Sequence, residues 1–307
     1  MQTQTAIVHT DAADAARRAP APPTIAHASD ADVARFLERF RRFGAAPSVE
    51  TYMPLFHPEA TLFDDGMERP IGYDEIPASI EATLALVQGF VMAPERWRVS
   101  GGALFVEARN EATIFGARKA WRSVYRIDLD GDRVRRGRRY YDRAPLLAAL
   151  EPEAPRLADL LPAAPVADDD ALARPAPPGT DERGLARDAL VALLARCWRG
   201  GSFAELVAHF RDDAVLIAPG APTPLHGAEA EGYLARLATL LRGAVPVARA
   251  VAGDDALVFV EWEASVPTAR GTYALGIADR FDLVDGRVLA ARRYFDAASL
   301  ARALAAA

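Results

Sequence analysis

Hydrophobic residues recur at helical and strand-like spacings that follow one order along the chain. A Ser29-Asp30 cap begins the first helical pattern, and Gly44 ends it. Asp64-Asp65-Gly66 and Asp130-Gly131 are turn signals that close strand-like runs. The predicted elements of the first half are helices over 29–43 and 48–56, a strand over 60–63, a helix from Gly72 to Val87, and strands over 104–109, 120–129 and 133–141.

The same order begins again at Leu185, with a helix to Trp198, a short helix over 202–210 and a strand over 214–217. Matching residues lie 154 positions apart, as Phe105 does from Phe259. The clearest repeat is Arg-Arg-Tyr-Tyr-Asp at 138–142 against Arg-Arg-Tyr-Phe-Asp at 292–296. Similarity that continues at a constant offset indicates an internal duplication, although two unrelated α+β domains could resemble each other by chance.

The duplication and the composition together predict a two-domain organisation. Proline, alanine and aspartate dominate residues 151–182, which is typical of a linker. We therefore expect a disordered tail over 1–28, a first domain over 29–150, the linker over 151–182, and a second domain over 183–307.

Composition excludes several classes of partner. Of the 307 residues, 51% are hydrophobic and 25% are charged, which is typical of a globular protein. A net charge of −6 provides no basic excess for nucleic acid, and no apolar run reaches the length of about 20 residues that spans a membrane. Residues 1–28 lack the apolar core of a secretory signal, so we expect a cytoplasmic protein. The single cysteine, Cys197, is expected to be a buried hydrophobe.

The order of elements, closed by Arg-Arg-Tyr-Tyr/Phe-Asp, resembles the SnoaL-like group of the nuclear-transport-factor-two-like superfamily. Ketosteroid isomerases and limonene-epoxide hydrolases are related to this group. The resemblance covers about 30–150 and 183–307. It implies an α+β fold in which each half is a cone, formed by a curved antiparallel sheet wrapped around about three helices and an apolar pocket. Because single-domain relatives commonly dimerise through their sheets, it also implies an internal pseudo-dimer, with further self-association possible.

Asp64 is the first candidate catalytic residue. It stands where the resemblance to ketosteroid isomerases places a general-base aspartate, and burial beside Phe63 would raise the pKa of such a carboxyl group. The alternative is a solvated turn, because acidic residues before glycine are common turn chemistry. The second half has Ile217-Ala218-Pro219-Gly220 here and offers no carboxylate.

A second candidate group lies on the strand over 104–109. Alternation places Glu107 and Arg109 on one face, and Glu261 and Glu263 on the matching face of the other half. The resemblance to limonene-epoxide hydrolases implies that such a pair could position and activate a water molecule. Cross-strand ion pairs on an exposed sheet face are the alternative explanation.

The repeated strand supplies a third group. Arg139 and Arg293 stand where relatives often carry an acid, which disfavours epoxide hydrolysis and favours an anionic substrate or a developing enolate. An ion pair of Arg139 with Glu107 or Asp64 is the structural alternative. Asp142 and Asp296 are expected to cap the helices that follow. The aromatic side chains that could enclose a flat ligand, or simply pack in a core, are Trp121, Tyr125, Tyr141 and Phe295.

Two classes of function follow. The first is a cofactor-independent polyketide-type cyclase, isomerase or dehydratase that moves a proton next to a carbonyl group, with Asp64 as base and Arg139 as enolate stabiliser. Against the isomerase version, the first helix has Phe36 and Phe40 but no tyrosine that could donate to the oxyanion. The second is a non-catalytic protein that binds a small molecule or acts as a scaffold, and epoxide hydrolysis is a third possibility. The histidines show no metal-site spacing and no glycine-rich loop follows a strand, so no metal and no nucleotide cofactor are expected.

Overall fold

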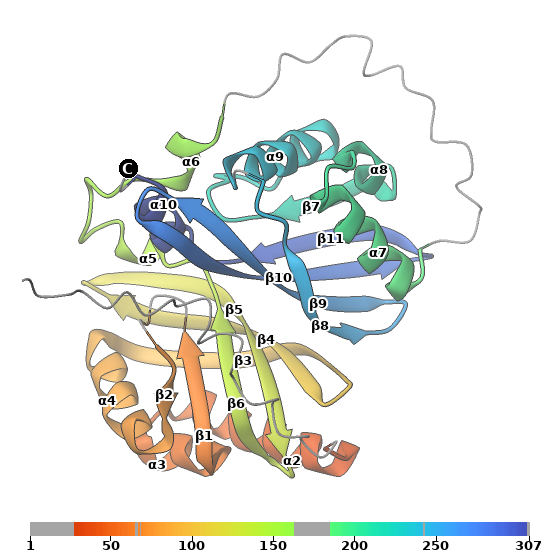
Figure 1. Cartoon of the computed structure of the whole chain (residues 1–307). Coiled ribbons are helices and arrows are strands. Elements are labelled where there is room, and N and C mark those ends of the chain that lie inside the picture. Colours follow the sequence, from red (N-terminus) through yellow and green to blue (C-terminus); the bar gives the residue numbers. More distant parts are fainter. Residues whose placement is uncertain (1–27, 65–66, 68, 163–184, 242, 306–307) are drawn as a thin grey trace, which may run out of the picture.

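The structure, a computed structural model, describes residues 28–64, 67, 69–162, 185–241 and 243–305. The expected tail and most of the expected linker lie outside the described residues, as does the Asp65-Gly66 turn. Figure 1 shows two sheets that meet in the middle of the molecule, with helices on the outer side of each sheet. No helix in the described part of the chain is long and apolar enough to cross a membrane.

The first half folds into helices followed by a long meander of strands. Ser29 caps the first helix and accepts a hydrogen bond from the backbone N–H of Asp32, as the sequence predicts. The elements are α2 (Asp30–Ala45), α3 (Val49–Tyr52), η1 (Met53–Leu55), β1 (Phe56–Asp64), β2 (Ile71–Gly72), η2 (Tyr73–Glu75), α4 (Ile76–Leu86), β3 (Val87–Ser100), β4 (Ala103–Ile114), β5 (Ala117–Asp130) and β6 (Arg133–Tyr140).

A connecting segment and the second half follow. The connection contains α5 (Ala144–Leu147) and α6 (Leu157–Leu160), so the described part of the expected linker is partly helical. The second half contains α7 (Arg187–Trp198), α8 (Phe203–Val207), β7 (Phe210–Ile217), α9 (Gly227–Leu240), β8 (Val247–Gly253), β9 (Leu257–Thr268), β10 (Gly271–Val284), β11 (Arg287–Tyr294) and α10 (Ala297–Ala305).

The two sheets share an order of five strands, to which the first sheet adds β2 at its edge, and this confirms the predicted pair of α+β cones. Their strand orders are β2-β1-β6-β5-β4-β3 and β7-β11-β10-β9-β8. Two details differ from the prediction. Each sheet is mixed rather than wholly antiparallel, because β1 pairs with β6 and β7 with β11 in parallel. Val87 begins strand β3 instead of ending a helix, because Gly89 has a φ of 62° and β-branched and aromatic residues follow it.

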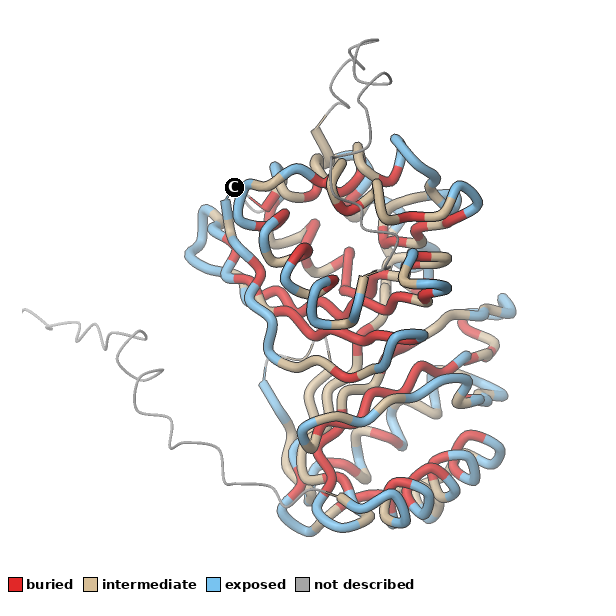
Figure 2. The backbone as a smooth tube through the Cα atoms, turned by 90° about the vertical axis from the view of Figure 1, so that its right-hand side faces the viewer, coloured by how far each residue is buried: buried red, intermediate tan, exposed pale blue. Residues whose placement is uncertain are grey.

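Each cone encloses its own core, and a further apolar cluster lies between the sheets. Figure 2 shows buried residues concentrated along the strands and on the inner sides of the helices. The cluster between the sheets contains Phe105 and Phe259, whose rings stack with centroids 5.7 Å apart. Strand alternation explains this division, because Leu104 and Val106 point into the first cone while Phe105 points toward the second domain.

Two glutamates at matching positions complete the contact between the sheets. Glu107 accepts hydrogen bonds from the hydroxyl group of Tyr294 and from Arg280 Nη1, the latter at 2.6 Å. Glu261 accepts from the hydroxyl group of Tyr140, and Arg126 Nε lies 3.4 Å from its carboxylate. Each domain thus offers the other the same residue types, as in the self-complementary interface of a twofold dimer.

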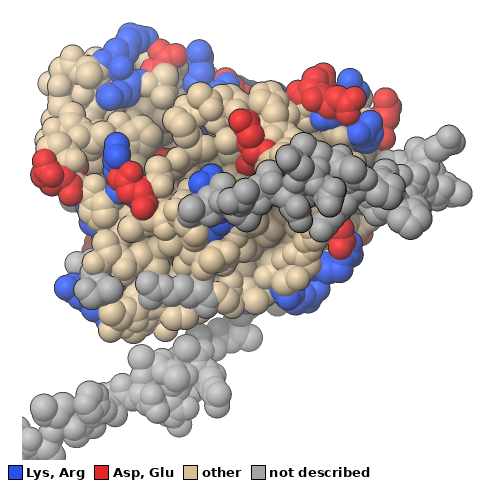
Figure 3. Space-filling view, turned by 90° about the horizontal axis from the view of Figure 1, so that it is seen from above, with Lys and Arg blue, Asp and Glu red and all other residues tan. Residues whose placement is uncertain are grey.

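Charged residues on the outer surface are mixed in sign. Figure 3, which shows the molecule from above, has basic and acidic side chains in small interspersed groups. Ion pairs on the protein surface include Arg196 with Glu205 at 2.6 Å and Arg249 with Glu263 at 2.8 Å. Exposed pairs of this kind contribute little to stability, roughly 0–1 kcal/mol each.

Candidate active site

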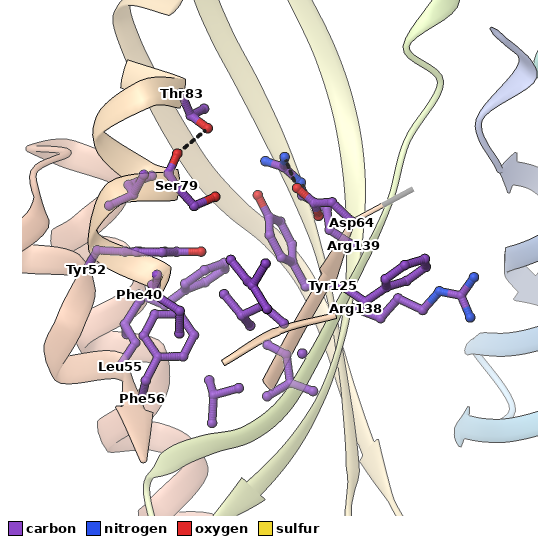
Figure 4. Close-up of a pocket in the computed structure, with 18 of the residues that line it drawn as sticks. Phe40, Tyr52, Leu55, Phe56, Asp64, Ser79, Thr83, Tyr125, Arg138 and Arg139 are labelled. Carbon is purple, nitrogen blue, oxygen red and sulfur yellow. Dashed lines mark hydrogen bonds and ion pairs between the residues drawn. The ribbon is translucent and has the colours of Figure 1, made fainter. Parts of the chain in front are cut away.

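The first cone contains a cavity of about 80 Å³ between its helices and the inner face of its sheet. Helix α2 contributes Phe36 and Phe40, and most of the remaining wall is also apolar. Polar groups are few, and Figure 4 shows several of them directed toward the same space. The polar side chains that line the cavity are Tyr52, Asp64, Ser79, Thr83, Tyr125 and Arg139, whereas Arg138 borders the cavity and its side chain points away from it.

Asp64 and Arg139 form an ion pair at this cavity. Strands β1 and β6 are parallel neighbours with Asp64 opposite Arg139, so their side chains share the inner face. Arg139 donates to both carboxylate oxygens, through Nε to Oδ1 at 2.9 Å and through Nη2 to Oδ2. The side chains are 21% (Arg139) and 24% (Asp64) exposed, so solvent reaches both. The two residues that the sequence places together as base and cation therefore do converge, and they are bound to each other.

The surroundings of Arg139 hold its guanidinium group in place. Tyr141 lies beneath it, with 4.5 Å from Arg139 Cζ to the ring centroid, and Arg139 Nη2 is 3.3 Å from the Tyr141 hydroxyl group. Although burial disfavours the charge, Asp64, Tyr141 and Tyr125 keep the pKa of Arg139 well above its ordinary value. Gly137 precedes it on the same face, where a side chain would meet Leu62. Arg139 is therefore a fixed cation beside the cavity.

Two phenols complete the polar part of the cavity. Tyr125 lies on β5 with its ring edge-on to Phe40, at 5.1 Å between centroids, and Tyr52 ends the short helix α3. Burial raises the pKa of both phenols, while Arg139 acts in the opposite direction. Both remain neutral hydrogen-bond donors near neutral pH. Sequence reasoning identified Tyr125 and missed Tyr52, for which the available signal was a tyrosine in the predicted second helix.

The second cone differs at each of these positions. Ala218 replaces the acid, and Arg293 instead pairs with Asp279, through Nε and Nη2 at 2.8 Å each. Asp279 stands 154 residues after Tyr125. Both charged side chains are 2% exposed, so the pair is enclosed by protein. The second arginine therefore has a structural partner from another strand.

Large side chains fill the second cone where the first has small ones. Trp198 corresponds to Gly44, and its ring centroid lies 4.8 Å from Arg293 Cζ. Tyr233 corresponds to Ser79, and its hydroxyl group donates to the carbonyl oxygen of Pro219 at 2.8 Å. Phe295 is fully buried in the same core. The structure therefore concentrates accessible polar chemistry in the first cone.

Several other predicted site residues lie away from the cavity. Glu107 and Glu261 point between the sheets, on the opposite face from Asp64, as described above. Arg109 lies outside with Glu111 at 3.3 Å, and Glu263 pairs with Arg249. Glu263 therefore fits the alternative of a cross-strand ion pair on an exposed sheet face, whereas Glu107 and Glu261 are buried in the contact between the domains and fit neither explanation.

The remaining aromatic candidates have separate environments. Trp121 packs against Phe90, with 6.0 Å between ring centroids, in a small cluster at the edge of the sheet. Phe63 borders the cavity and lies under Arg138, whose Cζ is 5.0 Å from the ring centroid. Asp296, directly before α10, accepts from the backbone N–H of Ala298, as expected of a cap. Asp142 accepts from the backbone N–H of Ala144, but the cap position of α5 is occupied by Arg143.

Comparison with known proteins agrees with the expected fold of the second half. Residues 190–291 match the family model described as SnoaL-like domain. The second half of the chain contains a SnoaL-like domain. The first half shares the five-strand order of this matched half, as expected from the resemblance to tandem SnoaL-like domains. No curated protein matches the sequence.

Solved structures similar to parts of the chain include three SnoaL-related or nuclear-transport-factor-two-like folds. A protein with a ketosteroid isomerase-like fold from Catenulispora acidiphila, in complex with trimethylamine, is 16% identical, covering 37% of this chain and 89% of its own, with a TM-score of 0.35. A candidate SnoaL-like polyketide cyclase from Jannaschia is 13% identical over 40% and 96%, with a TM-score of 0.35. An epoxide hydrolase from Mycobacterium tuberculosis, similar to limonene-epoxide hydrolase, is 17% identical over 40% and 98%, with a TM-score of 0.33.

Proposed function

We propose that the first SnoaL-like domain catalyses proton transfer next to the carbonyl group of a small molecule, without a cofactor. One observation carries the proposal: a carboxylate, a guanidinium group and two phenols converge on one mostly apolar cavity. Apolar cavities with a few converging polar groups are the usual form of small-molecule sites. The filled second cone has no carboxylate at the matching position and serves as the structural partner.

In the proposed reaction, Asp64 removes a proton from the carbon next to the carbonyl group. Arg139 occupies two of the roughly four acceptor positions of the carboxylate, which leaves others free to accept that proton. The electron pair moves to the carbonyl oxygen and forms an enolate. The hydroxyl groups of Tyr52 and Tyr125 and the remaining N–H groups of Arg139 can donate to this oxyanion.

The fate of the enolate decides the type of reaction. Return of the proton to another carbon gives an isomerisation, expulsion of a β-hydroxyl group gives a dehydration, and attack on a second carbonyl carbon closes a ring. All three need the same base and the same oxyanion donors. A SnoaL-like cyclase, an isomerase and a dehydratase therefore share the first step, and that step can be tested without the natural substrate.

The test is exchange of α-hydrogen for deuterium in a small ketone, such as cyclohexanone, followed by NMR in D₂O. Wild-type protein should accelerate the exchange, and Asp64→Asn should lower the acceleration by about 100-fold or more, the usual contribution of a general base. Asp212→Asn is the matched control, since its carboxylate is fully exposed on the second domain. Equal exchange rates for wild type and a folded Asp64→Asn variant would refute the mechanism.

A non-catalytic ligand-binding function is the second candidate. The observation that favours it is the ion pair itself, because Arg139 already engages both oxygens of Asp64. Under this alternative, cyclohexanone or a larger ketone binds to the cavity and its α-hydrogens do not exchange faster than in buffer. Calorimetry and the exchange measurement, made on the same sample, separate the two functions.

A further inference from the structure

A cleft of about 780 Å³ lies between the two domains, well apart from the cavity of the first cone. Its walls are the start of β5, the connecting segment from Asp142 to Ala158, the loop after β7, and the end of β11 with the start of α10. Figure 1 shows α5, α6 and α10 gathered at this side of the molecule. The volume is in the range of about 300–1,000 Å³ that holds small organic ligands, and alanine, proline and leucine residues form much of the wall.

The cleft arises where the approximate twofold relation between the domains fails. On one side of the interface, Arg138 lies directly against Gly276, where any side chain would collide with its guanidinium group. The residues 154 positions away are Arg292 and Arg122, so the arginine on the other side faces another arginine instead of a glycine. Both line the cleft, and their like charges are close enough to affect each other.

Arg292 is the cation of this pair that lacks a carboxylate. Arg122 is bound to Glu95, at 3.0 Å from Nε, whereas no carboxylate among the described residues forms an ion pair with Arg292. Its Nε atom is buried without a hydrogen-bond partner in the described structure. Burial lowers the pKa of Arg292, and the charges of Arg122 and Arg280 lower it further, while Tyr294 and Glu107 act in the opposite direction.

The other charges of the cleft leave it positive around Arg292. Lys119, the only lysine of the chain, also lines it. The acids of the cleft are already engaged: Glu151 pairs with Arg302 at 2.7 Å, and Asp142 accepts from the backbone N–H of Ala144. Even partial burial of an arginine without an ion-pair partner is unfavourable, and a bound anion would offset that cost.

We propose that this cleft binds an apolar small molecule that carries a carboxylate, with Arg292 as the residue that holds the anionic group. The planar guanidinium group matches a carboxylate through two parallel hydrogen bonds, and Lys119 and Arg122 add positive charge from the first domain. The apolar body of the ligand lies against the alanine and proline residues of the connecting segment. This site is independent of the proton transfer proposed for the first cone.

The affinity test uses 2-naphthoate as the probe and its uncharged amide, 2-naphthamide, as the comparison. Calorimetry on the full chain should show naphthoate binding at least about tenfold more tightly than the amide, because only the carboxylate pairs with the arginine. Arg292→Gln should remove that preference. Arg270→Gln, an exposed arginine that does not line the cleft, and Asp64→Asn, in the cavity of the first cone, should both retain it.

A second measurement uses wild-type protein and therefore does not depend on a variant that folds. An acylating reagent specific for amines has Lys119 as its only side-chain target, and the α-amino group serves as an internal reference. Mass spectrometry should show that naphthoate slows acylation of Lys119 several-fold and leaves the reference unchanged. Three results would overturn the proposal: no naphthoate binding at about 1 mM, binding lost with Asp64→Asn but kept with Arg292→Gln, or Lys119 acylated at the same rate with and without the probe.

Discussion

The contact between the two sheets makes a prediction that carries its own internal control. Glu107→Gln removes a fully buried charge that Arg280 and Tyr294 contact, and Glu261→Gln does the same at the matching position. Losing one partner of a buried ion pair costs about 3–5 kcal/mol of unfolding free energy. Arg280 retains Asp282 at 2.9 Å, so we expect the lower end, about 3 kcal/mol, for Glu107→Gln.

Glu261→Gln should lower the unfolding free energy by less than Glu107→Gln does. Arg126 is 3.4 Å from Glu261, its side chain is 19% exposed, and Asp128 already holds it at 2.6 Å. A weaker and more exposed contact of this kind is worth about 1 kcal/mol. Urea unfolding, monitored by tryptophan fluorescence, measures the unfolding free energy of each variant. A double-mutant cycle of Glu107→Gln and Tyr294→Phe measures the coupling between these two residues. A larger loss for Glu261→Gln, or no coupling between Glu107 and Tyr294, would refute the reasoning.

Acid provides a second check on the same pair. Burial acts to raise the pKa of Glu107, but Arg280 and Tyr294 outweigh it and hold the pKa below its ordinary value. A carboxylate with a lowered folded-state pKa stabilises the protein above its unfolded-state pKa and loses that contribution as the pH falls through the folded-state value. The deficit of Glu107→Gln should therefore be complete near neutral pH and shrink in acid.

Three further predictions concern the close contact of Gly44 with the backbone of β3, the connecting segment, and a buried acid. Gly44→Ala should lower the unfolding free energy by several kcal/mol, because the added Cβ would lie 2.0 Å from the carbonyl oxygen of Met92; chemical denaturation measures it. Leu157→Ala should lower the unfolding free energy by about 2–5 kcal/mol, because this side chain is 2% exposed and packs in the second core and against Gly220. A variant that unfolds at the same temperature as wild type would contradict this. Burial raises the pKa of Asp142 to about 6, so its ionisation destabilises the fold as the pH rises through that value. The Asp142→Asn variant should therefore have a higher melting temperature than wild type near neutral pH and the same melting temperature near pH 4.

The repeat and the hydrophobic periodicity predicted the order of elements, and the resemblance to SnoaL-like domains predicted their arrangement as cones. The predicted elements over 29–43, 120–129 and 133–141 fold as expected, and the constant offset of 154 residues extends to the strand order of both sheets. The parallel pairing of β1 with β6 could not be predicted in the same way. Local periodicity describes one strand at a time, whereas the direction of pairing depends on where the chain returns to the sheet.

The candidate site could be predicted only in part, for a related reason. Alternation correctly placed Glu107 and Arg109 on one face of a strand, but it cannot tell which face is inside the cone when both faces are buried. Glu107 consequently reached the interdomain contact rather than a catalytic pocket. The resemblance to ketosteroid isomerases identified Asp64, and the repeated strand identified Arg139, with Asp64 or Glu107 as its alternative ion-pair partners. Their position on the adjacent strands β1 and β6 comes from the structure.

The comparison of the two cones indicates why the arginine is repeated while its acid is not. Arg139 and Arg293 both lie among apolar and aromatic side chains, where an unpaired guanidinium group would be strongly unfavourable. The first copy meets this requirement with Asp64, at the edge of a cavity, and has Tyr125 on β5. The second copy places its acid, Asp279, at the position that corresponds to Tyr125. The acid thus lies on β1 in the first cone and on β10 in the second, so each buried arginine has a carboxylate partner, and only the first pair lies at the described cavity.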